Sequence, residues 1–351
     1  MSDRFLEEDV QLLGASDAFA PFAESTVLVT GATGLIGSLF VKGLAAWNDS
    51  HDQQVNVIAL ARSKDKAQRV LADCLARGDV KLVVGDVTNL PDIPDDIDWI
   101  SHGASVTSSA AFASKPVEVA LTEIEGTRAI LELAREKNVR GCVYLSSLEV
   151  YGDIPRDHGD VREGDAGVLD RFVPRNSYPA SKQMCEALCA GYAHEYGLNV
   201  RIARLAQTFG AGVAADDARV FASFARAVVE GAPIVLHTPG EGCRCYCYTT
   251  DAVEALAVIL AKGNRGEAYN VATPSTYCSV REMAEMVVAR YAESGVSLEF
   301  DMPDDISRFG FAAPSFVKLN SDKLQALGWS PRFDLPEMYD RLIGSMNCSA
   351  F

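Results

Sequence analysis

Apolar and polar positions divide the first part of the chain into short apolar runs alternating with stretches of helical period. The first run, "TVLVTGA" (26–32), is rich in β-branched residues and ends in glycine, and "IGSLFVKGLAAW" continues it with helical spacing. Further strands are predicted in "VNVIALAR" (55–62), "VKLVVGDV" (80–87), "IDWISHGA" (97–104) and "VRGCVYLSS" (139–147). Helical patterns lie in "KDKAQRVLADCLARG" (64–78) and "GTRAILELAREKN" (126–138). This alternation predicts an α/β protein with a doubly wound parallel sheet.

The pattern becomes less regular in the second half. "NVRIARLAQTFG" (199–210) predicts one more strand. Helices are predicted in "DARVFASFARAVVEG" (217–231), "TTDAVEALAVILAKG" (249–263), "SVREMAEMVVARYAESG" (279–295) and "LPEMYDRLIGSM" (335–346), with short strands in "PIVLHT" (233–238) and "CRCYCY" (243–248). We expect these elements to form a smaller C-terminal lobe over the carboxyl edge of the sheet, where ligands bind in open α/β sheets.

Composition narrows the class of protein. The 351 residues carry a net charge of −16, which disfavours nucleic acid as a partner because a phosphate backbone needs a basic surface. No apolar run approaches the roughly 20 residues of a membrane span. The first 24 residues are acidic and lack the apolar region of a signal peptide, so we expect an N-terminal helical extension against the body and a cytoplasmic location.

The nine cysteines fit a reducing compartment. Cys243, Cys245 and Cys247 alternate, which places them on one face of a strand. Neither a Cys-x-x-Cys pair nor a histidine cluster accompanies them, so we interpret them as free thiols and expect no metal site.

A glycine-rich loop follows the first predicted strand. In "TGATGLIG", Gly31 allows a tight turn, Gly34 lets the backbone approach a pyrophosphate, and Gly37 allows the helix to pack closely on the strand. The helix that begins there offers free N–H groups and the positive end of its dipole to phosphates. Because the order of strand, loop and helix agrees, the segment predicts a dinucleotide-binding, Rossmann-like domain, which we place at residues 25–210.

The end of the second strand bears on which dinucleotide binds. An acidic residue there would bond the ribose 2′-hydroxyl of NAD, but the chain has Ala61 followed by Arg62. Arg62 could meet the 2′-phosphate of NADP, which favours NADP; it could also stack on adenine or face solvent, which leaves NAD open. Asp86 could accept from the adenine amino group or cap a turn.

Tyr178 and Lys182 in "NSYPASK" are spaced to share one face of a helix. A tyrosine with a pKa near its ordinary value of about 10 is a poor base at neutral pH. A neighbouring lysine and a positive nicotinamide ring favour the phenolate. The pair can therefore accept the proton of an alcohol or sugar hydroxyl while a nicotinamide cofactor oxidises the carbon.

With these motifs the sequence resembles the extended short-chain dehydrogenase/reductase family, in its NAD(P)-dependent nucleotide-sugar epimerase, dehydratase and decarboxylase group. The resemblance runs from about residue 25 to residue 345. It is carried by "TGATGLIG", "GDV" (85–87), "SSLEVYG", "YPASK", "RLAQTFGAG", "CRCYCYTTDAVEAL" and "LNSDKLQALGWSP".

The resemblance implies several site residues. Ser147 would bond the sugar 4-hydroxyl beside Tyr178 and Lys182, and a lobe at 211–351, with the chain crossing back to the sheet, would hold a nucleoside diphosphate sugar. The cofactor is expected against Gly31, Thr33, Gly34, Leu35, Ile36, Gly37, Arg62, Asp86, Val87, Gly103, Ala104, Tyr178 and Lys182. Substrate contacts are expected from Ser105, Gln207, Arg219 and Arg244. Arg219 could instead pair with Asp216 or Asp217, and Arg244 could be an exposed strand residue.

Several positions depart from the family's usual pattern. The motif written Asn-x-x-Gly-Thr has Glu123 in place of asparagine, and the substrate asparagine is Gln207, followed by "TFGAG". His102, at a strand end, is interpreted as structural because Tyr178 already supplies the base. Helices around 126–138 and 178–193 carry apolar stripes, and the resemblance implies that such helices pair across the two-fold axis of a homodimer.

Leu148 and Glu149 discriminate among the reactions of this group, all of which pass through a 4-keto sugar. A 4,6-dehydratase uses an Asp–Glu pair at these positions, and Leu148 cannot donate a proton to a leaving hydroxyl. A decarboxylase needs no such acid, because a carboxylate β to the ketone leaves as carbon dioxide, and UDP-glucuronate decarboxylases resemble this site. Their segment Tyr-Asp-Glu-Gly-Lys differs, however, from "YPASK".

We therefore expect a UDP-glucuronate decarboxylase-like activity. A 4-epimerase is the first alternative and a 4,6-dehydratase the second. An NADPH-dependent reductase of a keto sugar or aldehyde and a non-catalytic dinucleotide sensor are alternatives of other classes. Glu149 is either the group that handles the C5 proton or a carboxylate bonded to the neighbouring loop.

Overall fold

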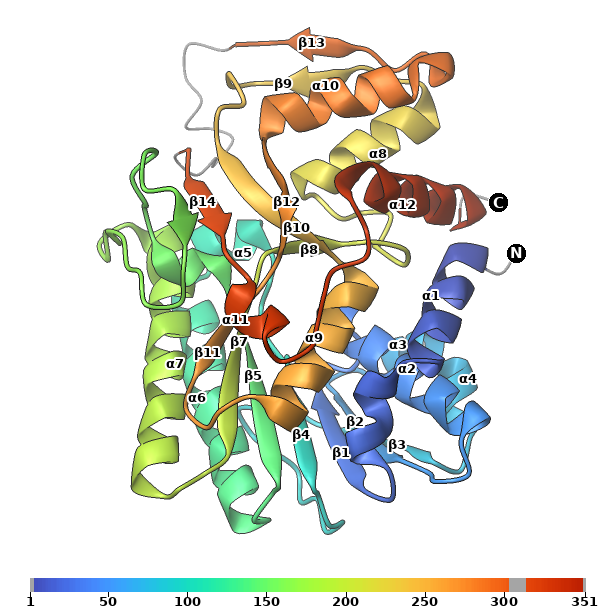
Figure 1. Ribbon diagram of the computed structural model, residues 1–351, viewed down its shortest axis with the longest axis vertical. Coiled ribbons are helices and arrows are strands. Elements are labelled where there is room, and N and C mark those ends of the chain that lie inside the picture. Colours follow the sequence, from blue (N-terminus) through green and yellow to red (C-terminus); the bar gives the residue numbers. More distant parts are fainter. Residues whose placement is uncertain (1–2, 303–313, 350–351) are drawn as a thin grey trace.

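The computed structural model describes residues 3–302 and 314–349. A parallel sheet with helices on both faces makes up the larger part, and a smaller lobe lies over one edge of it (Figure 1). The predicted doubly wound parallel sheet is confirmed.

The main sheet has seven strands in the order β11-β7-β5-β4-β1-β2-β3, and every neighbouring pair is parallel. The strand order reverses between β1 and β4, which is where open α/β sheets leave a crevice for ligands. The strands are β1 (Thr26–Thr30), β2 (Asn56–Ala61), β3 (Val80–Val84), β4 (Trp99–His102), β5 (Gly141–Ser147), β7 (Val200–Leu205) and β11 (Ala268–Val271).

Helices cover both faces of this sheet, as its apolar strands require. On one face α9 packs on β4, β5 and β7 and contacts α2, while on the other α6 and α7 pack on each other and on β5. The helices of this part are α1 (Arg4–Gly14), η1 (Asp17–Phe22), α2 (Leu35–Ser50), α3 (Lys64–Val70), α4 (Ala72–Leu75), α5 (Ser109–Ser114), α6 (Pro116–Glu136), η2 (Leu148–Tyr151), η3 (Pro174–Asn176), α7 (Ser177–Glu195) and α9 (Thr249–Lys262).

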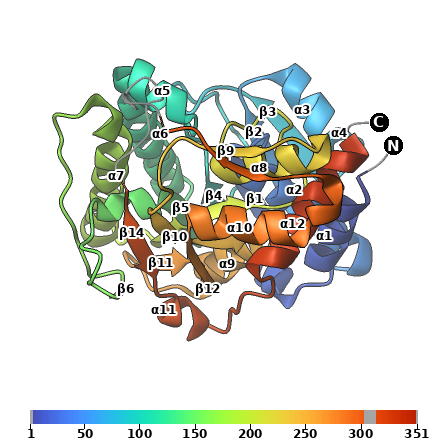
Figure 2. The same cartoon turned by 90° about the horizontal axis from the view of Figure 1, so that it is seen from above.

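The lobe has its own apolar core and two small sheets. Seen from above, helices α8, α10 and α12 lie over the main sheet (Figure 2). Its strands are β6 (Asp160–Val161), β8 (Gln207–Phe209), β9 (Ile234–Leu236), β10 (Cys243–Tyr248), β12 (Thr273–Ser279), β13 (Leu298–Phe300) and β14 (Phe316–Leu319). Its helices are α8 (Val220–Glu230), α10 (Val280–Arg290), η4 (Ala292–Ser294), α11 (Asp322–Gln325) and α12 (Leu335–Ser349).

Two predicted elements are each divided in the structure. The strand predicted over 199–210 ends at Leu205, and after Ala206 the chain continues as β8, which pairs with β10 of the lobe. Ala206 still donates its N–H to the carbonyl of Val271, so the chain leaves the main sheet directly after this bond. The helix predicted over 64–78 breaks at Leu71, whose buried side chain packs in the core.

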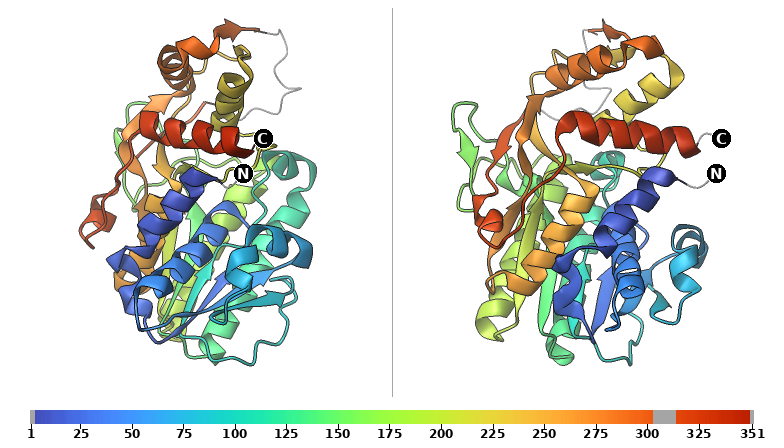
Figure 3. Two further views of the ribbon diagram at one scale, coloured as in Figure 1. Left: turned by 90° about the vertical axis from the view of Figure 1, so that its right-hand side faces the viewer. Right: turned by 45° about the vertical axis from the view of Figure 1, so that its right-hand side comes forward.

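The N-terminal extension lies against both parts of the molecule. Helix α1 packs along α2 and contacts α12, so that the first and the last helix lie close together (Figure 3). Its buried Asp9 accepts hydrogen bonds from the Tyr248 hydroxyl and the Arg341 guanidinium, each at 2.7 Å. The division of the chain at residues 24 and 210 stays a prediction, and α9 and β11, which follow residue 210, belong to the main layers.

All nine cysteines are free, and Cys245 and Cys247 are buried while Cys243 is half-buried. Within residues 3–302 and 314–349 no group of acidic, histidine and cysteine side chains could hold a metal ion. In the same residues no helix is long and apolar enough to cross a membrane.

Candidate active site

The turn after β1 requires glycine at two positions. Gly31 has φ +67°, and a Cβ on it would lie 2.7 Å from the carbonyl oxygen of Gly103. A Cβ on Gly37 would lie 2.3 Å from the carbonyl oxygen of Gly31. Larger residues would therefore push the turn away from the loop after β4 and from helix α2, and the turn would lose its shape.

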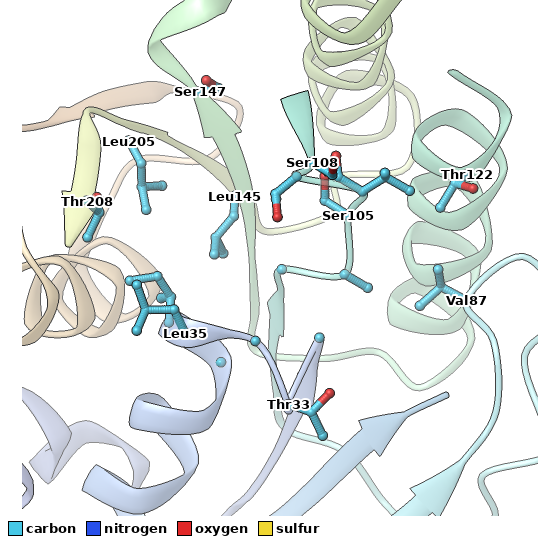
Figure 4. A pocket seen from close by; sticks show the side chains of 18 of the residues that line it. Thr33, Leu35, Val87, Ser105, Ser108, Thr122, Leu145, Ser147, Leu205 and Thr208 are labelled. Carbon is cyan, nitrogen blue, oxygen red and sulfur yellow. The ribbon is translucent and has the colours of Figure 1, made fainter. Parts of the chain in front are cut away.

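This turn presents the N-terminus of α2 to a cavity of about 600 Å³. Gly34 is the N-cap and provides no side-chain cap, so the first N–H groups of the helix are not capped by that residue. Leu35, Ile36 and Gly37 line the cavity, and Thr33 borders it (Figure 4). Uncapped N–H groups at a long helix's positive end suit a pyrophosphate, so the residues present fit a dinucleotide.

The far end of the cavity is lined by the ends of β2 and β3. Arg62, Ser63 and Lys66 follow β2, Asp86 and Val87 follow β3, and all five line the cavity. One oxygen of Asp86 accepts hydrogen bonds from the N–H and the hydroxyl of Thr88, at 2.9 and 2.8 Å.

Those bonds, led by the Thr88 N–H, hold the pKa of Asp86 below its ordinary value. Its other oxygen lies 4.0 Å from Arg62, whose side chain is 68% exposed. The bonds to Thr88 stabilise the turn at Asp86. Arg62 is largely exposed and lines the cavity.

Thr30 orders the loop after β4. Its hydroxyl oxygen accepts from the N–H groups of Gly103 and Ala104 at 3.2 and 3.1 Å, and lies 2.8 Å from Nδ1 of His102. Burial, with a contribution from Lys182, lowers the pKa of His102 to about 3. His102 is therefore neutral and serves the packing, while Gly103 and Ala104 line the cavity.

Tyr178 and Lys182 lie in the first two turns of α7, which begins at Ser177. Pro179 is tolerated in the first turn because its missing N–H would have no helical partner there. The Lys182 Nζ atom lies 5.7 Å from the centroid of the Tyr178 ring. The ring of Phe112, from α5, stacks on the Tyr178 ring, with the two centroids 4.2 Å apart.

Ser147, at the end of β5, brings the third group to the same place. Its hydroxyl hydrogen-bonds the Tyr178 hydroxyl, and it accepts from the N–H of Glu149 at 3.2 Å. Burial raises the pKa of Tyr178 above its ordinary value, with Glu123 and Glu149 adding to the effect, while Lys182 and the bond from Ser147 oppose it. The three predicted catalytic residues thus line one cavity together.

Lys182 is held by two acceptors. Its ammonium donates to the carbonyl of Leu145 at 2.8 Å and lies 2.9 Å from a carboxylate oxygen of Glu123. Burial alone would lower the pKa of Lys182, but the charges of Glu123 and Tyr178 outweigh it and the pKa is raised. Lys182 is therefore positively charged at neutral pH.

Leu148 and Glu149 form the wall of the cavity beside Ser147. Leu148 is 6% exposed and packs in the main core, so the position contributes no proton donor. Glu149 is about a quarter exposed and pairs with Arg175 of η3 at 3.2 Å. Glu149 thus both faces the cavity and is bonded to a neighbouring loop.

The predicted substrate residues fall into two groups. Ser105, Gln207 and Arg219 line the cavity, and Arg219 also pairs with Asp217, its Nε lying 3.0 Å from the carboxylate. Arg244 does not line this cavity and donates to the Ser315 hydroxyl at 3.2 Å. Its Nε is buried without a hydrogen-bond partner among the described residues.

Three residues near the chemistry were not assigned a role from the sequence. Arg175 lies three positions before Tyr178, but only the fold brings it to Glu149. Phe112 comes from α5, for which no helix was predicted. Glu123 was noted as a departure from the family pattern, and that departure was the available signal for its contact with Lys182.

The fold and this site together define a nicotinamide-dependent enzyme of the short-chain dehydrogenase/reductase type. Ser147, Tyr178 and Lys182 line the same cavity as the glycine-rich turn that suits a dinucleotide. A profile of the NAD dependent epimerase/dehydratase family matches residues 27–272, and the chain belongs to this family.

Known proteins agree with this assignment. The chain is 29% identical to UDP-glucuronic acid decarboxylase 6 of Arabidopsis thaliana over 313 residues, which cover 89% of this chain and 85% of the plant protein. It is 25% identical to the dTDP-glucose 4,6-dehydratase of Streptomyces venezuelae, solved with NAD bound, with a TM-score of 0.74 over 92% of this chain and 97% of that one.

A UDP-glucuronic acid 4-epimerase from Bacillus cereus, solved with UDP-glucuronic acid and NAD, shares the fold, with 18% identity and a TM-score of 0.75 over 92% of this chain and 99% of that one. The protein is thus a nucleotide-sugar modifying enzyme that uses NAD or NADP.

Proposed function

We propose that the enzyme decarboxylates a nucleoside diphosphate uronate, with UDP-glucuronate as the leading substrate. The observation that carries the proposal is the pair Leu148 and Glu149: a buried leucine where a dehydratase needs an acid, beside a carboxylate that faces the cavity and pairs with Arg175. The similarity to a plant protein named UDP-glucuronic acid decarboxylase supports it.

In this proposal a bound nicotinamide cofactor supplies the reversible oxidation of the sugar C4 hydroxyl to a ketone. Tyr178 takes the hydroxyl proton, helped by the charge of Lys182, and Ser147 holds the hydroxyl in place. The C6 carboxylate is then β to a carbonyl, so the C5–C6 bond breaks, carbon dioxide leaves and the electron pair stays on C5 and the C4 oxygen. Glu149 takes up a proton from solvent and delivers it to C5, which replaces the C5–C6 bond with a C5–H bond, and Tyr178 returns its proton to the C4 oxygen when the ketone is reduced.

Arg175 fits this sequence of steps as a group for the uronate carboxylate. Its guanidinium is held by Glu149 and lies over the Phe112 ring, at 5.9 Å from the centroid. Guanidinium groups bind carboxylates well because both are planar and can share two hydrogen bonds. An arginine beside a carboxylate that works at C5 would hold C6 next to it.

A 4-epimerase is the second candidate. It needs only the Ser–Tyr–Lys set and room for the keto sugar to turn, and the ion pair of Glu149 with Arg175 would then be structural. Incubation with a panel of UDP-, dTDP-, CDP- and GDP-sugars, followed by mass analysis, separates the reactions. Loss of carbon dioxide supports the decarboxylase, loss of water indicates a dehydratase, and an unchanged mass with altered stereochemistry indicates an epimerase. Net consumption of free NADPH would indicate a reductase.

We further propose that the preferred cofactor is NADP. Arg62, Ser63 and Lys66 line the cavity at the end of β2, where NAD-binding sheets carry an acid. We expect denatured enzyme to release NADP and Arg62→Asp to weaken NADP binding on the order of tenfold or more relative to NAD, since a charge-assisted bond is lost. Binding titrations measure the ratio. Arg69→Asp, at an exposed position of the following helix, is the control and should leave the ratio of NADP to NAD affinity unchanged. An unchanged ratio in Arg62→Asp would contradict the proposal.

A homodimer is also proposed. Val117 and Leu121 on α6 and Met184 on α7 are 69%, 48% and 52% exposed, so two neighbouring helices present apolar side chains to solvent. A second copy could cover them. Sedimentation should give twice the mass of the chain, and Leu121→Asp should give one chain mass, whereas Val235→Asp in the lobe should not change it. A single-chain mass for the wild type would exclude the dimer.

The enzyme is proposed to work in the cytoplasm. Its nine cysteines are all free, which suits a reducing compartment. Fractionation of cells should find it with cytoplasmic enzymes, and recovery in an oxidising compartment would contradict this.

A further inference from the structure

The ion pair between Glu123 and Lys182 lies behind the Tyr178 ring and is almost inaccessible to solvent. The side chain of Glu123 is 1% exposed and that of Lys182 is 3% exposed. Glu123 comes from α6, Lys182 from α7 and the second acceptor of the ammonium, the Leu145 carbonyl, from β5. Three elements of the main fold therefore fix the position of one charge next to Tyr178.

The Glu123 carboxylate has three donors around it. Besides Lys182, it accepts from the Ser105 hydroxyl and from the Tyr144 hydroxyl, the latter at 3.3 Å. A negative charge is thus held next to Lys182, where the family's usual pattern has a neutral asparagine.

We propose that Glu123 is a positioning residue that holds the Lys182 ammonium beside Tyr178, and that its negative charge opposes the pull of that ammonium on the Tyr178 proton. An ammonium at this position without Glu123 would draw the proton off Tyr178 more strongly. The Lys182 ammonium stays charged when it is paired with Glu123, but the negative charge of Glu123 cancels part of its effect on the Tyr178 proton. This inference rests on the proposed role of Tyr178 as proton acceptor, and not on which sugar is the substrate.

Other ionisable groups face the same place. On β5 the Tyr144 hydroxyl stays protonated, because burial and Glu123 raise its pKa. On β4 His102 is neutral, since burial lowers its pKa to about 3. Burial also raises the pKa of Cys185 on α7, which remains a thiol.

On η2 the Glu149 carboxylate is paired with Arg175. Among the described residues that influence the pKa of Tyr178, Glu123 and Lys182 thus form an ion pair with each other and with no further charged group. A change in the titration of Tyr178 on removal of the Glu123 charge can therefore be attributed to this pair.

The direction of the expected change follows from these charges. Tyr178 must lose its proton to act as a base. Removing the negative charge of Glu123 leaves the ammonium of Lys182 uncompensated, so the phenolate becomes more favourable and the midpoint of the Tyr178 titration moves to lower pH. A unit charge at such distances in a partly buried site moves a midpoint on the order of one pH unit.

The test is a pH titration of cofactor-free protein labelled with ¹³C at the tyrosine Cζ atoms and followed by NMR. The Tyr178 signal is identified by its loss in Tyr178→Phe. In Glu123→Gln and in Glu123→Asn, the family's usual residue, we expect the midpoint about one pH unit below that of the wild type. Glu123→Asp, which keeps a charge farther from Lys182, should lie between.

Glu118→Gln is the matched control, because it makes the same chemical change at an exposed position of α6. It should leave the Tyr178 midpoint unchanged. If Glu123→Gln does not fold, Glu123→Asn or the smaller shift of Glu123→Asp carries the test. A wild-type or higher midpoint in the folded Glu123 variants would overturn the proposal. Because no substrate is present, a wrong assignment of the sugar leaves this result intact.

Discussion

Tyr178→Phe is expected to lower turnover by at least about 10²-fold while the protein still folds and binds its cofactor. Tyr178 is the group proposed to accept the proton of the sugar hydroxyl, because Ser147 and the positive charge of Lys182 both favour its phenolate. The phenyl ring would still stack on Phe112, so the packing of the site should persist. Product formation measures the turnover, and binding titration measures the cofactor affinity.

Tyr192→Phe is the matched control for this result. Tyr192 lies on the same helix, and its hydroxyl bonds Glu132 rather than a residue lining the cavity. It should retain wild-type turnover. Undiminished turnover in Tyr178→Phe would show that this hydroxyl takes no part in the reaction. If the wild type itself showed no turnover, the result would support a non-catalytic dinucleotide sensor.

Glu149→Gln is expected to lower product formation about 10²-fold or more while oxidation at C4 continues. Gln cannot deliver a proton to C5, so C4 is oxidised and carbon dioxide is lost without protonation of C5 and return of the hydride, and reduced nicotinamide should accumulate on the enzyme. The near-ultraviolet absorbance of the reduced nicotinamide after mixing with UDP-glucuronate measures oxidation at C4, and product analysis measures product formation.

Arg175→Gln separates the carboxylate from the ion pair. It breaks the same pair at 3.2 Å from the other side but leaves Glu149 in place. We expect mainly a higher KM, since the group proposed to hold the uronate is lost. Equal losses of C4 oxidation in both variants would show that the pair only supports the loop, and unchanged turnover in Glu149→Gln would exclude Glu149 from the chemistry.

The parts of the site that could be predicted from the sequence are those encoded by short spacings. Gly31, Gly34 and Gly37 lie on one turn, and Tyr178 and Lys182 on adjacent turns of one helix, so local geometry brings each set together. The alternation of strands and helices likewise predicted the sheet, because buried parallel strands are continuous apolar runs.

The contacts that could not be predicted join distant segments. Glu123 meets Lys182 only because α6 and α7 pack side by side, and Arg175 meets Glu149 only because the fold brings η3 to the end of β5. The strand predicted over 199–210 divides because β8 finds a partner in β10, and partner choice depends on tertiary structure while the apolar pattern continues through Ala206.

The most direct test of the proposed reaction uses UDP-glucuronate labelled with ¹³C at the C6 carboxylate. Wild-type enzyme with its own bound cofactor should release one labelled carbon dioxide for each sugar consumed, yield an unlabelled UDP-pentose and leave added nicotinamide nucleotide unchanged. Retention of the label in the sugar product, whether an epimer, a dehydrated sugar or a reduced one, would contradict the account.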